Sequence, residues 1–126
     1  MTPFHPDQLT LGDLLALLAC RDPDHRVWFD FCSFQPTRLG SYRGFYEQLA
    51  LGHEESTMNG PLVRGLLVQL RNAVGATFHG YKGGAYVMGP STPLWVANPG
   101  DAGSTAIVGL ADCSWATVIL TRWLDV

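Results

Sequence analysis

Two segments of the chain each combine basic side chains, aromatic rings and glycines. The first runs from Arg38 to Glu47 and the second from Phe78 to Tyr86. Arginine and lysine form charge-assisted hydrogen bonds with phosphate, glycine allows close approach to the backbone, and an aromatic ring offers a face on which a base can stack. Since these groups together can hold a nucleotide, the two segments are candidate parts of one nucleotide-binding site.

The candidate ligand-binding residues fall into three chemical groups. Cations would contact phosphate, rings would stack on bases or wall the site, and a histidine and an amide would hydrogen-bond to polar edges. The cations are Arg38, Arg43 and Lys82; the rings are Tyr42, Tyr46, Phe78, Tyr81 and Trp95; the polar groups are His79 and Asn98. An alternative interpretation remains for several of them, because aromatic residues also complete a small core, Trp95 suits a core strand and Asn98 suits a turn cap.

The sequence lacks the common catalytic signatures G-x-S-x-G, H-E-x-x-H and G-x-x-x-x-G-K-[ST]. The stretch Gly80–Gly84 resembles part of a phosphate loop, but a glycine follows Lys82 and the stretch comes after an expected helix instead of before it. No His or Cys residues stand at metal-ligand spacing. We therefore expect a binding protein with no catalytic residue, metal or cofactor. The alternative is a phosphodiesterase-like enzyme that uses His79 as acid or base.

Composition narrows the class of protein. The chain has 126 residues, 47% of them hydrophobic, which suits a single domain over residues 1–126. Eight basic residues against eleven acidic ones give no basic footprint for duplex nucleic acid. The cysteines Cys20, Cys32 and Cys113 form no C-x-x-C pair, which favours a reducing compartment. With no apolar run near the roughly 20 residues of a membrane span and no basic, apolar start, we expect a cytoplasmic protein with no membrane partner.

Local signals predict two helices. Thr10 and Asp13 form an approximate capping box for a helix that ends near Cys20, before the break at Pro23. The second helix follows Pro61, carries apolar residues at helical spacing and stops at Gly75.

The remaining elements are expected to be strands. We expect strands at Arg26–Phe31 and at Tyr42–Leu51, with a short helix over Phe45–Leu51 as the alternative. Pro36–Ser41, Gly52–Gly60 and Asn98–Asp101 are expected to be loops or turns. Strands at Leu94–Ala97, Thr105–Leu110 and Trp115–Arg122 would form an antiparallel meander, with Asp112–Ser114 as one tight connection.

The expected fold is therefore α+β, an antiparallel sheet with a C-terminal three-stranded meander and two helices packed on one face. A faint internal echo accompanies this pattern: a leucine-rich helix precedes the strand with Trp28, and another precedes the strand with Trp95.

Three blocks of the chain resemble a family of small phage and prophage proteins: Ser41–Leu51, Gly75–Gly84 and Thr92–Asn98. The resemblance covers most of the chain, although this sequence has Ala85 where the family has an acidic residue and Pro99 where it has an aromatic one. It implies a phage setting, hence the cytoplasm of a host cell.

Phages carry many small proteins that inhibit host defence, and one class sequesters nucleotide second messengers. By analogy, we expect this protein to bind a small anionic nucleotide, such as a cyclic ADP-ribose-like molecule or a cyclic dinucleotide, without turning it over. Because such pockets are often built between subunits, we also expect a homo-oligomer. The alternative is a protein–protein inhibitor or adaptor that uses the same aromatic and arginine residues as interface anchors.

Overall fold

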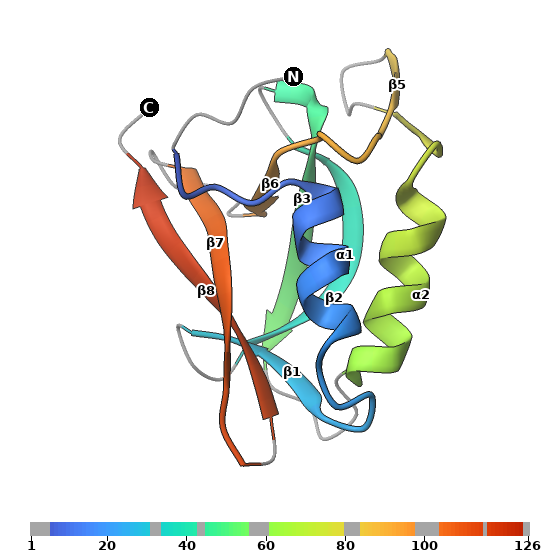
Figure 1. Ribbon diagram of the computed structural model, residues 1–126. Helices are drawn as coiled ribbons and strands as arrows, with labels where there is room; N and C mark the ends of the chain where they lie inside the picture. Colours follow the sequence, from blue (N-terminus) through green and yellow to red (C-terminus); the bar gives the residue numbers. More distant parts are fainter. Residues whose placement is uncertain are drawn as a thin grey trace.

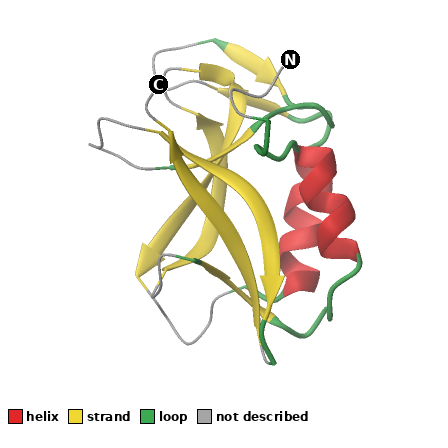
Figure 2. Ribbon diagram, turned by 60° about the vertical axis from the view of Figure 1, so that its left-hand side comes forward, coloured by secondary structure: helices red, strands yellow, loops and turns green. Residues whose placement is uncertain are grey.

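Two helices lie side by side on one side of a curled six-stranded sheet (Figures 1 and 2). The computed structural model describes residues 6–30, 34–42, 45–55, 61–79, 84–97, 104–114 and 116–124; within its strands, the side chains of residues 34–38, 41–42, 45–47, 53–55 and 104 are not described. The elements are α1 (Leu11–Ala19), β1 (Arg26–Phe29), β2 (Phe34–Tyr42), β3 (Phe45–Glu55), α2 (Val63–Ala73), β4 (Thr77–His79), β5 (Ala85–Val87), β6 (Leu94–Val96), β7 (Ser104–Asp112) and β8 (Ala116–Leu124).

The capping box predicted for the first helix is confirmed. The backbone N–H of Asp13 donates to Thr10 Oγ1 at 3.2 Å, and the backbone N–H of Thr10 donates to the Asp13 carboxylate at 3.0 Å. Two otherwise unpaired donors at the start of α1 are thereby satisfied. Leu11, Leu14 and Leu18 share one face of the helix and are fully buried.

The second helix is confirmed as well, but backbone groups cap it. Its N-cap residue, Leu62, makes no side-chain cap; instead the N–H groups of Val63 and Arg64 donate to the carbonyls of His25 and Pro23 at 2.9 and 3.1 Å. The loop after α1 therefore holds the start of α2. The helix stops before Gly75, whose φ of 78° lies in the left-handed region that glycine adopts at little cost.

The six strands of the sheet lie in the order β1-β8-β7-β6-β3-β2. The predicted meander is confirmed, since β6, β7 and β8 are successive antiparallel neighbours. Two pairings are parallel, β1 with β8 and β3 with β6. The two edge strands β1 and β2 contact each other, so the sheet curls back towards itself.

This topology repeats one unit twice. Each unit is a helix, a short strand and an antiparallel hairpin: α1, β1 and β2–β3, then α2, β6 and β7–β8. The short strand of each unit pairs in parallel with the last strand of the other unit. Val27 and Phe29 in β1 match Leu94 and Val96 in β6, and all four side chains are buried in the main core. The weak Trp28–Trp95 echo in the sequence therefore marks equivalent strands.

Four sequence expectations need correction. Pro36–Ser41 is strand, not loop, because it forms most of β2. A bulge between Pro36 and Arg38 accommodates the proline, which cannot donate to the ladder. Phe45–Leu51 is strand, so the helical alternative is wrong, and β3 continues to Glu55 where a loop was expected. Tyr42 belongs to β2, across the hairpin from Phe45. The expected turn at Asn98–Asp101 and the strand residue Phe31 lie outside the described residues.

We predict that Thr10→Ala lowers the free energy of unfolding by about 1 kcal/mol, because it removes the side-chain half of the capping box. Chemical denaturation followed by circular dichroism measures this change. Thr77→Ala, at an exposed strand position, is the matched control and should change stability by less than about 0.5 kcal/mol. Equal effects of the two substitutions would contradict a specific role for the cap.

Candidate functional site

The β4–β5 hairpin interrupts the symmetry of the two units. In the first unit a short loop joins α1 to β1, whereas in the second unit the segment between α2 and β6 contains the two-stranded sheet β4–β5. Within the fold, β4 contacts β2 and β5 contacts β3. In Figure 1, β5 and the end of the hairpin where β2 passes into β3 lie at the same end of the molecule. The two segments singled out in the sequence thus belong to neighbouring elements.

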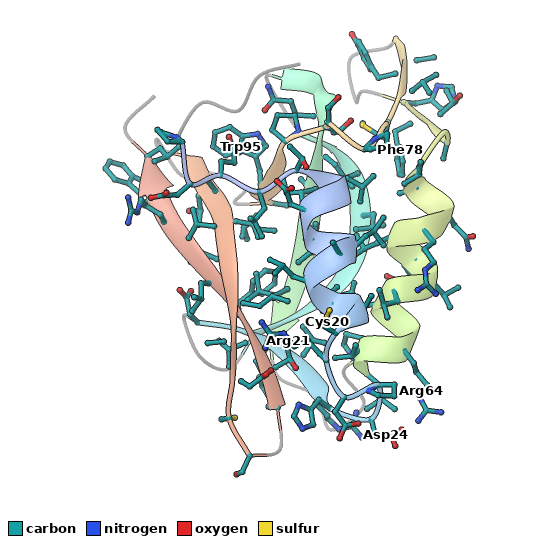
Figure 3. All side chains as sticks on the ribbon, in the orientation of Figure 1. Cys20, Arg21, Asp24, Arg64, Phe78 and Trp95 are labelled. Atoms are coloured by element: carbon teal, nitrogen blue, oxygen red, sulfur yellow. The ribbon has the colours of Figure 1, made fainter. Side chains whose placement is uncertain are left out.

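Two aromatic residues anchor this hairpin to the protein. Phe78 and Tyr86 are directly opposite each other in the β4–β5 ladder. Both side chains are partly buried and pack against the main core. Phe78 is labelled in Figure 3. A two-stranded sheet is marginal by itself, so this contact with the core is what fixes the hairpin in place. Most of the ring surface of Phe78 is therefore used in packing.

His79 lies on the other face of the hairpin. Successive side chains of a strand point to opposite faces, so His79 faces away from the core that Phe78 contacts. The structure accordingly shows His79 exposed, across from Ala85. Phe78 and His79 therefore do not face one common side, and a ligand that contacted His79 would lie on the outer face of the hairpin.

Gly84 is a second point of constraint. Its φ is 94°, in the left-handed region, and a β-carbon built there would lie 2.8 Å from the hydroxyl oxygen of Tyr86. The phenol ring of Tyr86 therefore lies directly against the backbone where β5 begins. Sequence analysis treated Gly84 only as one of several permissive glycines, and it included Tyr86 in the second segment without listing it among the ligand-binding residues. The positive φ could not be told from composition.

Trp95 is fully buried and offers no surface to a ligand in this structure. Its indole N–H donates a hydrogen bond to Gln48 Oε1, and it packs with Ala50, Ala106 and Leu124 on the side of the sheet away from the helices. This position agrees with the core alternative for Trp95. Gln48 itself, 3% exposed, was missed; a lone glutamine before an apolar strand run was its only signal in the sequence.

The other candidate residues are placed only in part. The backbones of Arg38, Tyr42 and Tyr46 lie on β2 and β3, with Tyr42 at the end of the hairpin and Arg38 further down the strand, opposite Gly52. Their side chains are not described. Arg43, Tyr81, Lys82 and Asn98 lie outside the described residues.

Several arginines are engaged with carboxylates elsewhere in the fold. Arg21 pairs with Asp112 at 2.5 Å, Arg122 pairs with Asp7 at 3.4 Å, and Arg64 pairs with Asp24. Three of the other five basic residues, Arg38, Arg43 and Lys82, belong to the two candidate segments.

A polar network lies at the end of the molecule opposite β4–β5, between the loop after α1 and the β7–β8 connection. Thr117 Oγ1 donates to Asp112 at 3.2 Å and lies 3.3 Å from His25 Nδ1, while Asp112 also accepts from Arg21. Sequence analysis did not single out this network. Thr117 is fully buried, and these contacts join the loop after α1 to the sheet, while Arg21 Nε is buried with no hydrogen-bond partner among the described residues.

Among the described residues no group of three His, Cys, Asp or Glu side chains is arranged to hold a metal ion. In the same part of the chain, neither helix is long and apolar enough to cross a membrane. Comparisons of the chain with protein-family models, curated proteins and solved structures found no significant match.

We predict opposite effects for two glycine-to-alanine substitutions. Gly84→Ala should destabilise the protein by about 1–3 kcal/mol, because alanine disfavours the positive φ and its β-carbon would meet Tyr86. Gly65→Ala should stabilise it by about 0.5–1 kcal/mol, since Gly65 lies in α2 with open space around it. Thermal or urea unfolding measures both. A neutral Gly84→Ala would show that the Tyr86 contact does not constrain this backbone.

Proposed function

We propose that the protein binds a small anionic nucleotide at the end of the molecule formed by the β2–β3 and β4–β5 hairpins, and holds it without chemical conversion. Cyclic ADP-ribose-like molecules and cyclic dinucleotides are the substrate class to which the chemistry of the two segments is suited. The cations Arg38, Arg43 and Lys82 would contact phosphate, and Tyr42, Tyr46 and Tyr81 would contact the bases.

The observation that carries the proposal is the pairwise contact of β4 with β2 and of β5 with β3. The segments Arg38–Glu47 and Phe78–Tyr86 are distant in the chain, yet their residues within β2, β3, β4 and β5 lie on these four neighbouring strands. The β4–β5 hairpin, moreover, is present in only one of two otherwise equivalent units. An elaboration restricted to one unit is not needed to complete the shared core, so it is a natural place for a specific activity.

Charge gives a second line of support. The chain carries a net charge of −3, which by itself repels an anion, so a nucleotide must be held by local cations. Arg21, Arg64 and Arg122 are already paired with carboxylates, which reduces their attraction for a further anion. In this proposal Arg38, Arg43 and Lys82 of the two candidate segments supply that local positive charge.

The proposal gives Phe78 a different role from the base stacking expected from the sequence. It stands against the core and across from Tyr86, so we assign it to positioning the hairpin instead of stacking on a base. Trp95 leaves the proposed site because it is fully buried. The biological role rests on the resemblance of the three sequence blocks to phage proteins: a bound nucleotide signal would be withheld from a host defence receptor.

We predict that calorimetric titration of the protein against cyclic ADP-ribose isomers and cyclic dinucleotides detects at least one ligand. Arg43→Ala and Lys82→Ala should each weaken its binding by about tenfold or more, because each removes a charge-assisted bond to phosphate. Binding should also weaken as salt increases, since exposed ionic contacts are screened.

Arg64→Ala is the matched control, because it removes one cation from the N-terminal end of α2 while leaving the candidate segments intact. It should leave the affinity unchanged. Absence of heat across the whole panel would overturn the proposed function. Chromatography of the recovered ligand separates binding from catalysis: an intact ligand supports a binder, and a converted one supports the phosphodiesterase-like alternative.

One observation favours the alternative of a protein–protein inhibitor. Val87, on the outer face of the β4–β5 hairpin with His79, is 65% exposed. In this second function, Val87 would be an apolar anchor of the contact with the partner. If the nucleotide panel is silent, a purified partner whose binding is lost on Val87→Lys and kept on Val68→Lys would support this second function.

A further inference from the structure

The two units of the fold correspond residue by residue where their helices begin. At the start of α2, two successive backbone N–H groups donate to carbonyls that precede β1. At the start of α1, the N–H groups of Leu11 and Gly12 donate in the same way to the carbonyls of Thr92 and Pro90, which precede β6, at 2.8 Å each. Because the same pair of hydrogen bonds occurs twice, it shows which residues of the two units are equivalent.

The β2–β3 and β7–β8 hairpins also share an irregularity. The ladder of β2 with β3 skips Thr37, and the ladder of β7 with β8 skips Val108. Each skipped residue lies just beyond the point where the last strand of the unit leaves its parallel partner, which is Leu51 in β3 and Ile119 in β8. The two strand ladders can therefore be aligned one residue at a time.

This alignment reveals an insertion in β3. Residues 46–48 have no partner on β2, although Phe45 and Leu49 on either side of them pair with adjacent residues of β2. At the equivalent place in β8, Ala116 and Thr117 follow each other directly and bond to adjacent residues of β7. β3 therefore carries three residues that its counterpart lacks, and we call them the β3 bulge (residues 46–48).

The β3 bulge and the β4–β5 hairpin belong to neighbouring strands. β5 contacts β3 and β4 contacts β2, and Figure 1 shows β5 at the end of the molecule where β3 begins. Each insertion occurs in one unit, while the other unit keeps the same strand pairing without it. The repeated architecture therefore requires neither of them. Bulges are common beside functional sites, where they redirect a side chain.

A buried hydrogen bond joins the β3 bulge to the sheet. Gln48, the last residue of the bulge, is 3% exposed, and its Oε1 accepts from the indole N–H of Trp95. Trp95 belongs to β6, whose parallel ladder with β3 begins at Leu49, the next residue. The residue equivalent to Gln48 in β8 is one that precedes Thr117 directly, Ala116, which has no side-chain acceptor. This contact is therefore not part of the repeat.

We propose that the β3 bulge is part of the ligand-binding site and that Gln48 is a positioning residue for it, through the hydrogen bond from Trp95. This inference rests on the proposed function and extends it, because the nucleotide would lie where the β3 bulge and the β4–β5 hairpin meet. Tyr46, one of the residues assigned to base contact, is the first residue of the bulge. The buried bond at its last residue would fix the backbone that presents Tyr46 to the ligand.

We predict that deletion of residues 46–48, combined with Trp95→Phe so that no indole N–H loses its acceptor, leaves the protein folded, because β8 pairs without equivalent residues. Circular dichroism and cooperative urea unfolding measure this outcome. Deletion of residues 120–122, which are paired in β8, is the control and should abolish cooperative unfolding. A deletion of residues 46–48 that unfolds the protein would overturn the identification of the bulge as an insertion.

Binding tests the role of the bulge. For a nucleotide detected by calorimetric titration, the deletion variant should lose binding, and Gln48→Leu and Trp95→Phe should each weaken it by about tenfold. The double variant should be no weaker than either single variant, since both remove the same hydrogen bond. Trp28→Phe changes the equivalent tryptophan of the other unit and is the matched control, so it should leave the affinity unchanged.

The outcomes separate this inference from the function on which it rests. A wild-type chain that binds no member of the panel overturns the proposed function, and the assignment of the bulge falls with it. If the wild type binds and the folded deletion variant binds equally well, the assignment of the bulge alone is wrong. Equal losses of affinity for Trp28→Phe and Trp95→Phe would show a general effect on stability and would refute positioning by Gln48.

Discussion

The exchange of parallel strand pairing between the two halves of the chain is the constraint on which the fold depends. β1 can complete its ladder only on β8, and β6 pairs in parallel only with β3. Neither half can therefore pair its short strand by itself. The buried residues of both halves form one cluster under α1 and α2, including Phe29 and Ile119 from one exchanged pair and Leu51 and Val96 from the other. This shared core is buried only when both halves are in place, so contacts between residues that are distant in the chain must form together.

With the same exchange, the turns of the β2–β3 and β7–β8 hairpins lie at opposite ends of the molecule. A different segment of the chain contacts each hairpin. The loop after α1 meets the β7–β8 connection through Arg21 and Asp112, and Thr117 and His25 belong to the same polar network. The equivalent segment after α2 is longer and forms β4–β5 against β2 and β3. In the first arrangement the Asp112 carboxylate contacts both the Arg21 guanidinium and the Thr117 hydroxyl. The second is where the architecture departs from its own repeat, and this departure is one of the reasons for proposing a binding site there.

Sequence predicted those parts of the fold whose signals are local. Thr10 and Asp13 indicate the start of α1, and the apolar spacing after Pro61 indicates α2. Short connections between the last strands indicate the meander. β2 was mistaken for a loop because Pro36 and Gly40 are turn residues by composition, and because a strand with a bulge loses regular alternation. Parallel pairing of β1 with β8 left no local trace at all: it joins residues 26–29 to 116–119, and no pattern within either segment specifies its partner.

The candidate site was predictable in its residue types and not in their directions. Both cation–aromatic segments lie on neighbouring strands, yet alternation along β4 turns Phe78 to the core and His79 to solvent. Trp95 shows the same limit, since its neighbours Leu94 and Val96 face the main core while its own ring enters a smaller cluster beside Gln48. Rings that anchor a hairpin cannot also be free to stack. If the proposed function holds, Phe78 contributes no stacking, and affinity would come mainly from phosphate contacts and only secondarily from base stacking.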